Sequence, residues 1–230
     1  MLLTHFGRSA VALALVAAVS AQAEPSPRDL LTQASFVDRD KAMAIRRVGA
    51  AERLAAAAVQ RTPGDREAAL MHATAIGYRA KLTGSRGDAI AARKEMEALV
   101  ARDPRDAERH LVLGAWHMGA VYRLGRIVAR AALGAQKPVG LAALDRAVAL
   151  GGSRAMFAGC AALLRLEADP KDARARTLLE TAARGSTPTA IDRHFQRAAT
   201  AVLVPLRAGN TDATRKLAAR LLPFGTIDEG

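Results

Sequence analysis

The sequence has few aromatic residues, and this shortage limits the folds that are open to it. Of its 230 residues one is Trp, two are Tyr and five are Phe, while half are hydrophobic. A β-sandwich or barrel uses many more aromatic and β-branched side chains. Alanine-rich helices can pack closely without them. The composition therefore predicts an all-α fold.

Cysteine is nearly absent as well. The single Cys160 excludes an internal disulfide, so the fold must be held by packing alone. It lies in the apolar stretch 156–164, with no His or Asn beside it that would favour a thiol nucleophile. We expect Cys160 to be a small buried hydrophobic residue.

Motifs that carry enzyme chemistry are also missing. The chain has no glycine-rich phosphate loop, no nucleophile elbow and no carboxylate pair at a strand end. His110 and His117 lie two helical turns apart and lack the four-residue spacing of paired zinc ligands. The sequence therefore predicts no enzymatic activity, no metal site and no cofactor.

The one long apolar run lies near the start of the chain and is too short to cross a bilayer, which takes about 20 residues. Arg8 precedes the run 10–19, and Ala21-Gln22-Ala23 is typical of a signal-peptidase site. No cysteine follows to take a lipid anchor. We expect a signal peptide at 1–23, followed by one soluble, exported, periplasmic domain at 24–230 without an integral membrane segment.

The chain is strongly basic, with a formal net charge of +12, of which only Arg8 falls within the signal peptide. The basic residues are spread along the chain and are not clustered with aromatics, so the sequence does not favour nucleic acid as a partner. An anionic partner, either an acidic protein or a membrane surface, stays open.

A pattern of small and large residues recurs four times, at offsets of four, three and five residues. Its members are Ala51, Ala55, Ala58 and Pro63; Ala92, Met96, Leu99 and Pro104; Gly140, Leu144, Ala147 and Gly152; and Ala175, Leu179, Ala182 and Thr187. The first three positions fall on one helical stripe, and the fourth is where the helix stops. With the turn residues between these blocks, the pattern predicts about ten antiparallel helices joined by short turns.

Single residues inside these helices carry finer predictions. Asp65 and Asp88 are candidate N-caps for the helices that follow them. Gly49 is a candidate break in the helical run 38–60. Gly114 and Gly119 are expected to mark close helix contacts, because a glycine inside a helix costs about 1 kcal/mol relative to alanine.

The four blocks resemble the second helix of a tetratricopeptide repeat, which has a small residue, a bulky one four later, a small one three later, and then Pro. Met118-Gly119-Ala120-Val121-Tyr122 is similar to the Leu-Gly-x-x-Tyr of its first helix, and Trp116 lies near its aromatic position. Gly152 and Thr187 replace Pro, and the intervals depart from the family's period of about 34 residues. The resemblance implies a right-handed α-solenoid of degenerate repeats over 28–225, with a binding surface on its inner face.

The third repeat is lengthened by an insertion at 125–137. Arg123, Arg126 and Arg130 recur at three and four residues, so we expect them to share one helix face beside Trp116 and Tyr122. This face is either a solvated surface or the basic rim of a binding site with aromatic anchors. These five residues are the predicted partner-binding site.

Two functions fit these observations. The first is a non-enzymatic periplasmic scaffold or adaptor that binds a protein or peptide, as the resemblance implies. The alternative is an accessory subunit of a periplasmic solute-uptake system that holds a small ligand inside the solenoid. An open groove would favour a peptide, and an enclosed apolar cavity would favour a small ligand. The sequence predicts no oligomeric state.

Overall fold

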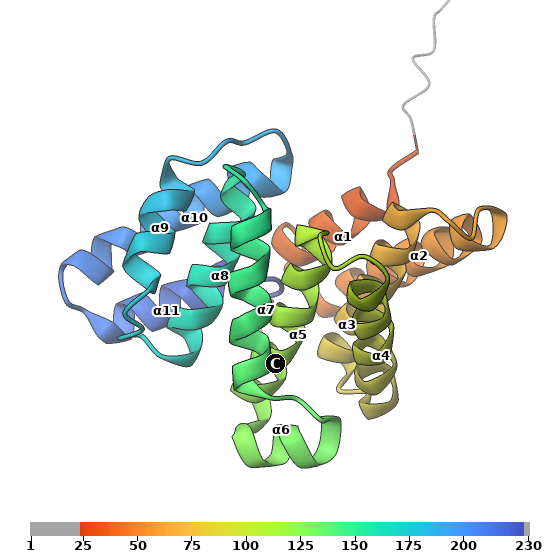
Figure 1. The fold of residues 1–230 in the computed structure, drawn as a ribbon, viewed down its shortest axis with the longest axis horizontal. Helices are drawn as coiled ribbons and strands as arrows, with labels where there is room; N and C mark the ends of the chain where they lie inside the picture. The colour runs from red at the N-terminus through yellow and green to blue at the C-terminus, as the bar shows by residue number, and fades with distance from the viewer. Residues whose placement is uncertain (1–23, 228–230) are drawn as a thin grey trace, which may run out of the picture.

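In a computed structural model, residues 24–227 form eleven α-helices, and no β-strand occurs among these residues. The helices are α1 (Pro27–Phe36), α2 (Lys41–Arg61), α3 (Arg66–Thr83), α4 (Arg86–Arg102), α5 (Ala107–Leu124), α6 (Arg126–Leu133), α7 (Lys137–Leu150), α8 (Ala155–Ala168), α9 (Ala175–Ala183), α10 (Ala190–Arg207) and α11 (Thr211–Leu221). The all-α prediction is confirmed, with eleven helices instead of about ten (Figure 1). The predicted signal peptide at 1–23 lies outside the described residues.

Short polar side chains set where several helices begin. The Asp65 carboxylate accepts a hydrogen bond from the Ala68 backbone N–H at 2.9 Å, so the predicted cap of α3 is confirmed. The prediction for Asp88 is wrong, because Ser85 caps α4 and Asp88 lies in the first turn, where it pairs with Arg79. Gly49 does not interrupt α2, which continues to Arg61.

The repeated stripe is buried. All twelve stripe positions are buried except Ala58, which is half-buried. Helix α2 ends before Pro63, α4 before Pro104 and α7 before Gly152, as the fourth position of each block predicts. The pattern therefore correctly identified the packed face and the end of three helices, whereas α9 ends at Ala183, four residues before Thr187. The solenoid arrangement and its handedness stay predictions.

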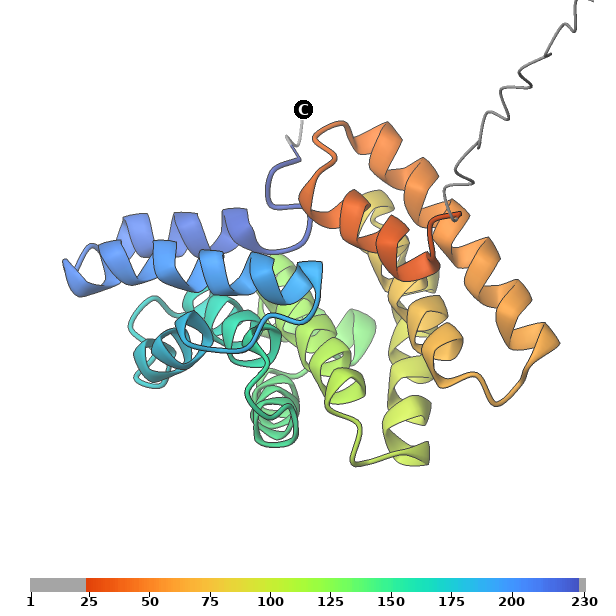
Figure 2. The ribbon, with the colours of Figure 1, turned by 90° about the horizontal axis from the view of Figure 1, so that it is seen from above.

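The helices are divided between two hydrophobic cores. Helices α1 to α4 pack mainly on their neighbours in sequence and share one core, which also takes in Leu113 of α5. The second core is centred on α8, which contacts α5, α7, α9, α10 and α11 and is buried at every position from Ala155 to Glu167. Figure 2 shows α1 to α4 on one side of α5 and α8 to α11 on the other.

Helices α5 and α7 approach each other closely through glycine. A Cβ on Gly114 would lie 2.9 Å from the Leu144 side chain, and one on Gly140 would lie 3.0 Å from His117 and from Met118. The expectation of a close contact is confirmed for Gly114. It is wrong for Gly119, where a Cβ would meet nothing within 4 Å. The α5 surface around Gly119 faces open space.

Within residues 24–227, no helix is both long enough and apolar enough to cross a bilayer.

Candidate binding site

A large cleft lies where the two cores meet, with a volume of about 1510 Å³. Its walls come from α1, α3 and α4 on one side, from α8, α10 and α11 on the other, and from α5 and α6 between them. The chain after α11 also lines it, from Leu222 to Ile227. The cleft is therefore the seam between the two halves of the molecule, on the side where α3, α5 and α8 face one another.

The floor of the cleft is apolar because it exposes the edges of both cores. Leu31, Met71 and Tyr78 come from the α1–α4 core or pack against it, and Met156, Leu164 and Phe195 come from the α8 core; all six line the cleft. An apolar floor can bury the apolar part of a ligand at about 25 cal/mol per Å² of surface removed from water.

Two ionisable groups of α8 lie on this floor. Glu167 is 8% exposed and makes no hydrogen bond to any residue that the structure describes. Burial raises the pKa of its carboxyl to about 7, against a smaller lowering by the charge of Lys81. Cys160 is buried as expected, and burial raises the pKa of its thiol to about 12. The floor therefore offers one carboxyl that a ligand could contact and an unreactive neutral thiol.

The rim of the cleft is basic. The exposed basic side chains that line it are Arg39, Lys81, Arg86, Arg123, Arg215, Lys216 and Arg220. Two acidic side chains, Glu108 and Glu167, are among the described lining residues. Such an excess of one sign attracts ligands of the opposite charge and raises their association rate. The electrostatics of the cleft therefore favour a ligand with carboxylates or other anionic groups.

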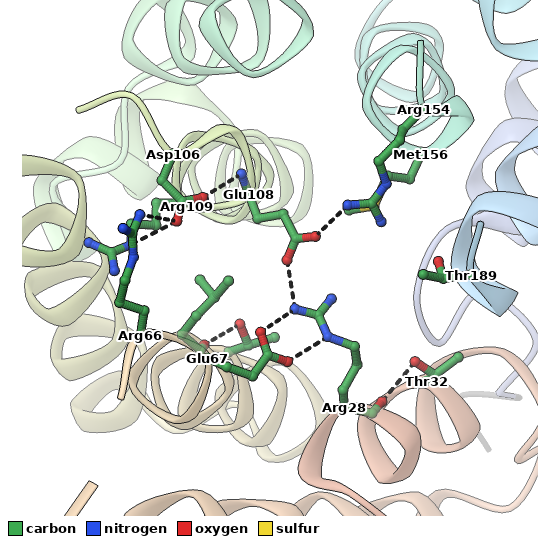
Figure 3. A network of polar contacts seen from close by, with 12 residues as sticks. Arg28, Thr32, Arg66, Glu67, Asp106, Glu108, Arg109, Arg154, Met156 and Thr189 are labelled. Carbon is green, nitrogen blue, oxygen red and sulfur yellow. Dashed lines mark hydrogen bonds and ion pairs between the residues drawn. The ribbon is translucent and has the colours of Figure 1, made fainter. Parts of the chain in front are cut away.

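A chain of ion pairs adjoins the cleft, which two of its members, Arg28 and Glu108, line (Figure 3). Arg28 Nε lies 2.6 Å from Glu67 Oε1, and Arg28 Nη2 lies 2.7 Å from Glu108 Oε2. The other oxygen of Glu108 lies 3.1 Å from Arg154 Nη1, and Arg154 Nη2 lies 3.1 Å from Asp192 Oδ2. The ion pairs run from α1 and α3 through α5 to the start of α8 and α10. They therefore join the two halves of the molecule.

Arg28 and Asp192 in this chain of ion pairs are both well satisfied. Burial raises the pKa of Asp192, but hydrogen bonds from Thr189, Arg154 and the Met156 backbone N–H outweigh it and hold the pKa below its ordinary value. Burial likewise lowers the pKa of Arg28, but the hydrogen bonds and charges of its two glutamate partners, Glu67 and Glu108, raise it above the ordinary value. Both groups stay ionised at neutral pH. These two residues therefore belong to a fixed structural link, with little capacity left for a ligand.

Only some of the predicted site residues line the cleft. Trp116, Tyr122 and Arg123 line the cleft, whereas Arg126 and Arg130 lie on α6 and do not. The prediction that the three arginines share one helix face is wrong, because α5 ends at Leu124 and Gly125, with φ of 75°, starts the separate helix α6. Only glycine adopts this backbone conformation readily. The Arg123 guanidinium is also held by the Lys81 carbonyl oxygen at 2.6 Å.

His117 and His110 each contact a different backbone group. His117 is buried, and its Nδ1 accepts a hydrogen bond from the Gln136 backbone N–H at 3.2 Å; burial lowers its pKa to about 4. His110 Nε2 contacts the Pro104 carbonyl oxygen. Among residues 24–227, no three His, Cys, Asp or Glu side chains are grouped so that they could hold a metal ion.

Sequence reasoning missed Glu167 and the C-terminal segment of the cleft wall. A signal for Glu167 was present, because it is the acidic residue of a helix whose other residues, apart from Arg165, are apolar. Such a helix is typical of a buried core position, where a carboxyl is costly unless it has a partner or a function. No comparable signal marks Phe224, because its place in the cleft wall depends on the path of the chain after α11.

Comparison with known proteins found no matching family model, no matching curated protein and no matching solved structure.

Proposed function

We propose that this chain is an exported, non-enzymatic binding module, a degenerate tetratricopeptide-like solenoid that receives an extended segment of a protein partner in its cleft. The observation that carries the proposal is the cleft of about 1510 Å³ with an apolar floor and a basic rim. Pockets for single small ligands are usually about 300–1,000 Å³. A larger open cleft suits a peptide segment, which would bury apolar side chains on the floor and place acidic ones at the rim.

One observation favours the alternative function, that of a ligand-binding accessory subunit of a solute-uptake system. The Glu167 carboxyl is an ionisable group on the floor that makes no hydrogen bond to a described residue. A few polar groups in an apolar cavity are typical of small-molecule sites, where they fix the orientation of the ligand. A protein partner and a small molecule are separated by the mass of what binds in the cleft.

The test is crosslinking from inside the cleft. A photoreactive benzoylphenylalanine replaces Tyr122, which lines the cleft and is 49% exposed, and the protein is illuminated in the host's periplasm. The control places the same group at Val204, which is exposed on α10 and does not line the cleft. We expect a protein adduct from position 122 that is absent from position 204. A small increase in mass at position 122 would support the alternative, and equal adducts at both positions would remove the cleft as the site.

Export is tested separately. The small residues Ala21 and Ala23 fit the signal-peptidase pattern, so intact-mass measurement of the periplasmic protein should give a chain that begins at Glu24. A mature chain that still carries Met1 would contradict the proposed localisation and leave the cleft unaffected.

A further inference from the structure

The segment after α11 crosses the cleft from one half of the molecule to the other. Leu222 packs in the α8 core, whereas Phe224, two residues later, is part of the α1–α4 core, with Ile227 packed against it. All six residues from Leu222 to Ile227 line the cleft. Figure 2 shows this segment leaving α11 and ending beside α1. The cleft therefore already contains a short piece of peptide folded into turns, supplied by the chain itself.

Phe224 is the anchor of this segment. Its side chain is almost fully buried, and its ring meets the Tyr78 ring edge-on with centroids 4.9 Å apart. Its backbone N–H donates to the Ser35 carbonyl oxygen at 2.8 Å, and Lys81 Nζ donates to the Pro223 carbonyl oxygen at 2.8 Å. Main-chain hydrogen bonds and one aromatic side chain in a pocket are the contacts by which proteins usually hold a bound peptide.

The backbone at this anchor is strained. Phe224 has a φ of 64°, and among residues 24–227 no other non-glycine residue has a positive φ. A large side chain in this conformation costs about 1–3 kcal/mol. Gly225 is also constrained, because a Cβ there would collide with the Ala219 carbonyl oxygen. The contacts of the tail therefore compensate for a strain that a separate peptide, free to choose its backbone, would not carry.

We propose that the tail Leu222–Ile227 is an internal occupant of the cleft, and that the pocket of Phe224 recognises an aromatic side chain of the partner segment, which displaces the tail. This inference rests on the proposed function and specifies the partner's chemistry: an aromatic residue followed by carboxylates. The carboxylates follow from the basic rim, and in the chain's own sequence Phe224 is followed by Asp228 and Glu229. The partner binds only when the tail leaves, so the tail sets the affinity of the cleft.

The probe for this inference is a synthetic peptide with the sequence of residues 222–230, Leu-Pro-Phe-Gly-Thr-Ile-Asp-Glu-Gly, labelled for fluorescence anisotropy. It is added to the full chain and to two full-length variants. Phe224→Ala empties the pocket, and Gly225→Ala dislodges the tail while it keeps the phenyl ring. Trp116 is the only tryptophan and lines the cleft, so its emission reports binding independently. Val204→Ala, far from the cleft lining, is the matched control.

We expect both tail variants to bind the peptide at least tenfold more tightly than the wild type and the Val204→Ala control. An attached tail competes at a local concentration of about millimolar, and removing it frees the binding-competent state. Replacing the peptide's Phe by Ala should abolish binding, and replacing its Asp and Glu by Asn and Gln should weaken it and reduce its dependence on salt.

Three outcomes would overturn the inference: equal binding to wild type and variants, binding that survives the Phe→Ala change in the peptide, or loss of helical structure in both tail variants. The last outcome would show that the tail is a required part of the fold and is not displaced. A partner that crosslinks to position 122 equally in wild type and Phe224→Ala would leave the proposed function standing while this inference fails.

Discussion

The two halves of the molecule are built on different principles. Helices α1 to α4 form a stack in which each helix packs mainly on the next, and α1, α2 and α4 each bury only a narrow face of three or four residues. The other half is a bundle around α8, which is covered on all sides by five helices. In a stack of this kind, each pair of neighbouring helices adds its own contribution to stability. A central helix instead packs against all the helices around it, so these helices are stabilised together. The cleft lies where a stack meets a bundle.

This difference matters for binding. We expect the stack, in which each helix packs mainly on the next, to adjust more easily than the bundle, in which α8 contacts five other helices. The cleft takes one wall from each half. A partner segment would therefore be held between a rigid wall that carries Glu167 and a more adjustable wall that carries Tyr78 and the pocket of Phe224.

The largest effect is expected from truncating the centre of the bundle. Leu163 of α8 is completely buried, so Leu163→Ala should lower the free energy of unfolding by about 2–5 kcal/mol through lost burial and a cavity. Leu54→Ala on α2 is the control, since that side chain is 43% exposed and its loss should cost less than about 1 kcal/mol. Urea denaturation measures both. Similar costs at the two positions would contradict the central role of α8.

A smaller effect, with a pH dependence, is expected at Glu167. Its folded-state pKa of about 7 lies above the ordinary 4.5, so the folded protein keeps a proton that the unfolded chain releases between these values. Stability therefore falls as pH rises from about 4.5 to 7 and stays lower above pH 7. Glu167→Gln should stabilise the protein by about 1–3 kcal/mol at pH 8 and by little at pH 4.

The matched control for Glu167 is Glu180→Gln on α9, which removes only a pair with the exposed Arg207. Its effect should stay below about 1 kcal/mol. Thermal or urea unfolding at pH 4 and pH 8 gives the comparison. A Glu167→Gln variant that is destabilised at pH 8 would contradict the prediction, because the ionised carboxylate of Glu167 would then stabilise the folded protein.

The smallest effect is expected on α5, the helix shared by both halves. Gly114→Ala introduces a Cβ 2.9 Å from Leu144, which should cost about 1–3 kcal/mol and be offset by about 1 kcal/mol of helix propensity. Gly119→Ala gains the propensity without a clash, because that position faces open space. We expect a lower melting temperature for the first variant and an unchanged or higher one for the second. The reverse order of melting temperatures would contradict this placement of α5, in which Gly114 packs against α7 and Gly119 faces open space.

Local features of the fold could be predicted from the sequence, and their assembly could not. The cap at Asp65 and the buried stripe through Leu144 and Leu179 follow from residue type and helical spacing, which depend on a few neighbouring residues. The position of α8 at the centre depends on which helices surround it, and stripe spacing says nothing about that. The signal was the uninterrupted apolar run from Ala155 to Leu164, which a search for apolar stripes does not single out.

The candidate site could be predicted only in part, for a similar reason. Trp116, Tyr122 and Arg123 line the cleft because they lie on one continuous helix, α5. The extension to Arg126 and Arg130 fails at Gly125, where a positive φ redirects the chain and with it the helix face. The contribution of Phe224 depends on a contact with Tyr78 across nearly 150 residues of sequence, which no local pattern encodes.

The most direct test of the account is native-state hydrogen exchange on the wild type and on Leu163→Ala. If the cleft is the seam between a stack and a bundle, amides of α8 should exchange only through global unfolding, and those of α2 and α4 through smaller openings of their own half. In Leu163→Ala, the free energy of exchange of the α8 and α10 amides should then fall by as much as the free energy of unfolding of the whole protein. The free energy of exchange of the most easily opened amides of α2 and α4 should stay unchanged. Uniform protection in both halves, lowered equally by the variant, would show one cooperative unit and contradict the division on which the cleft depends.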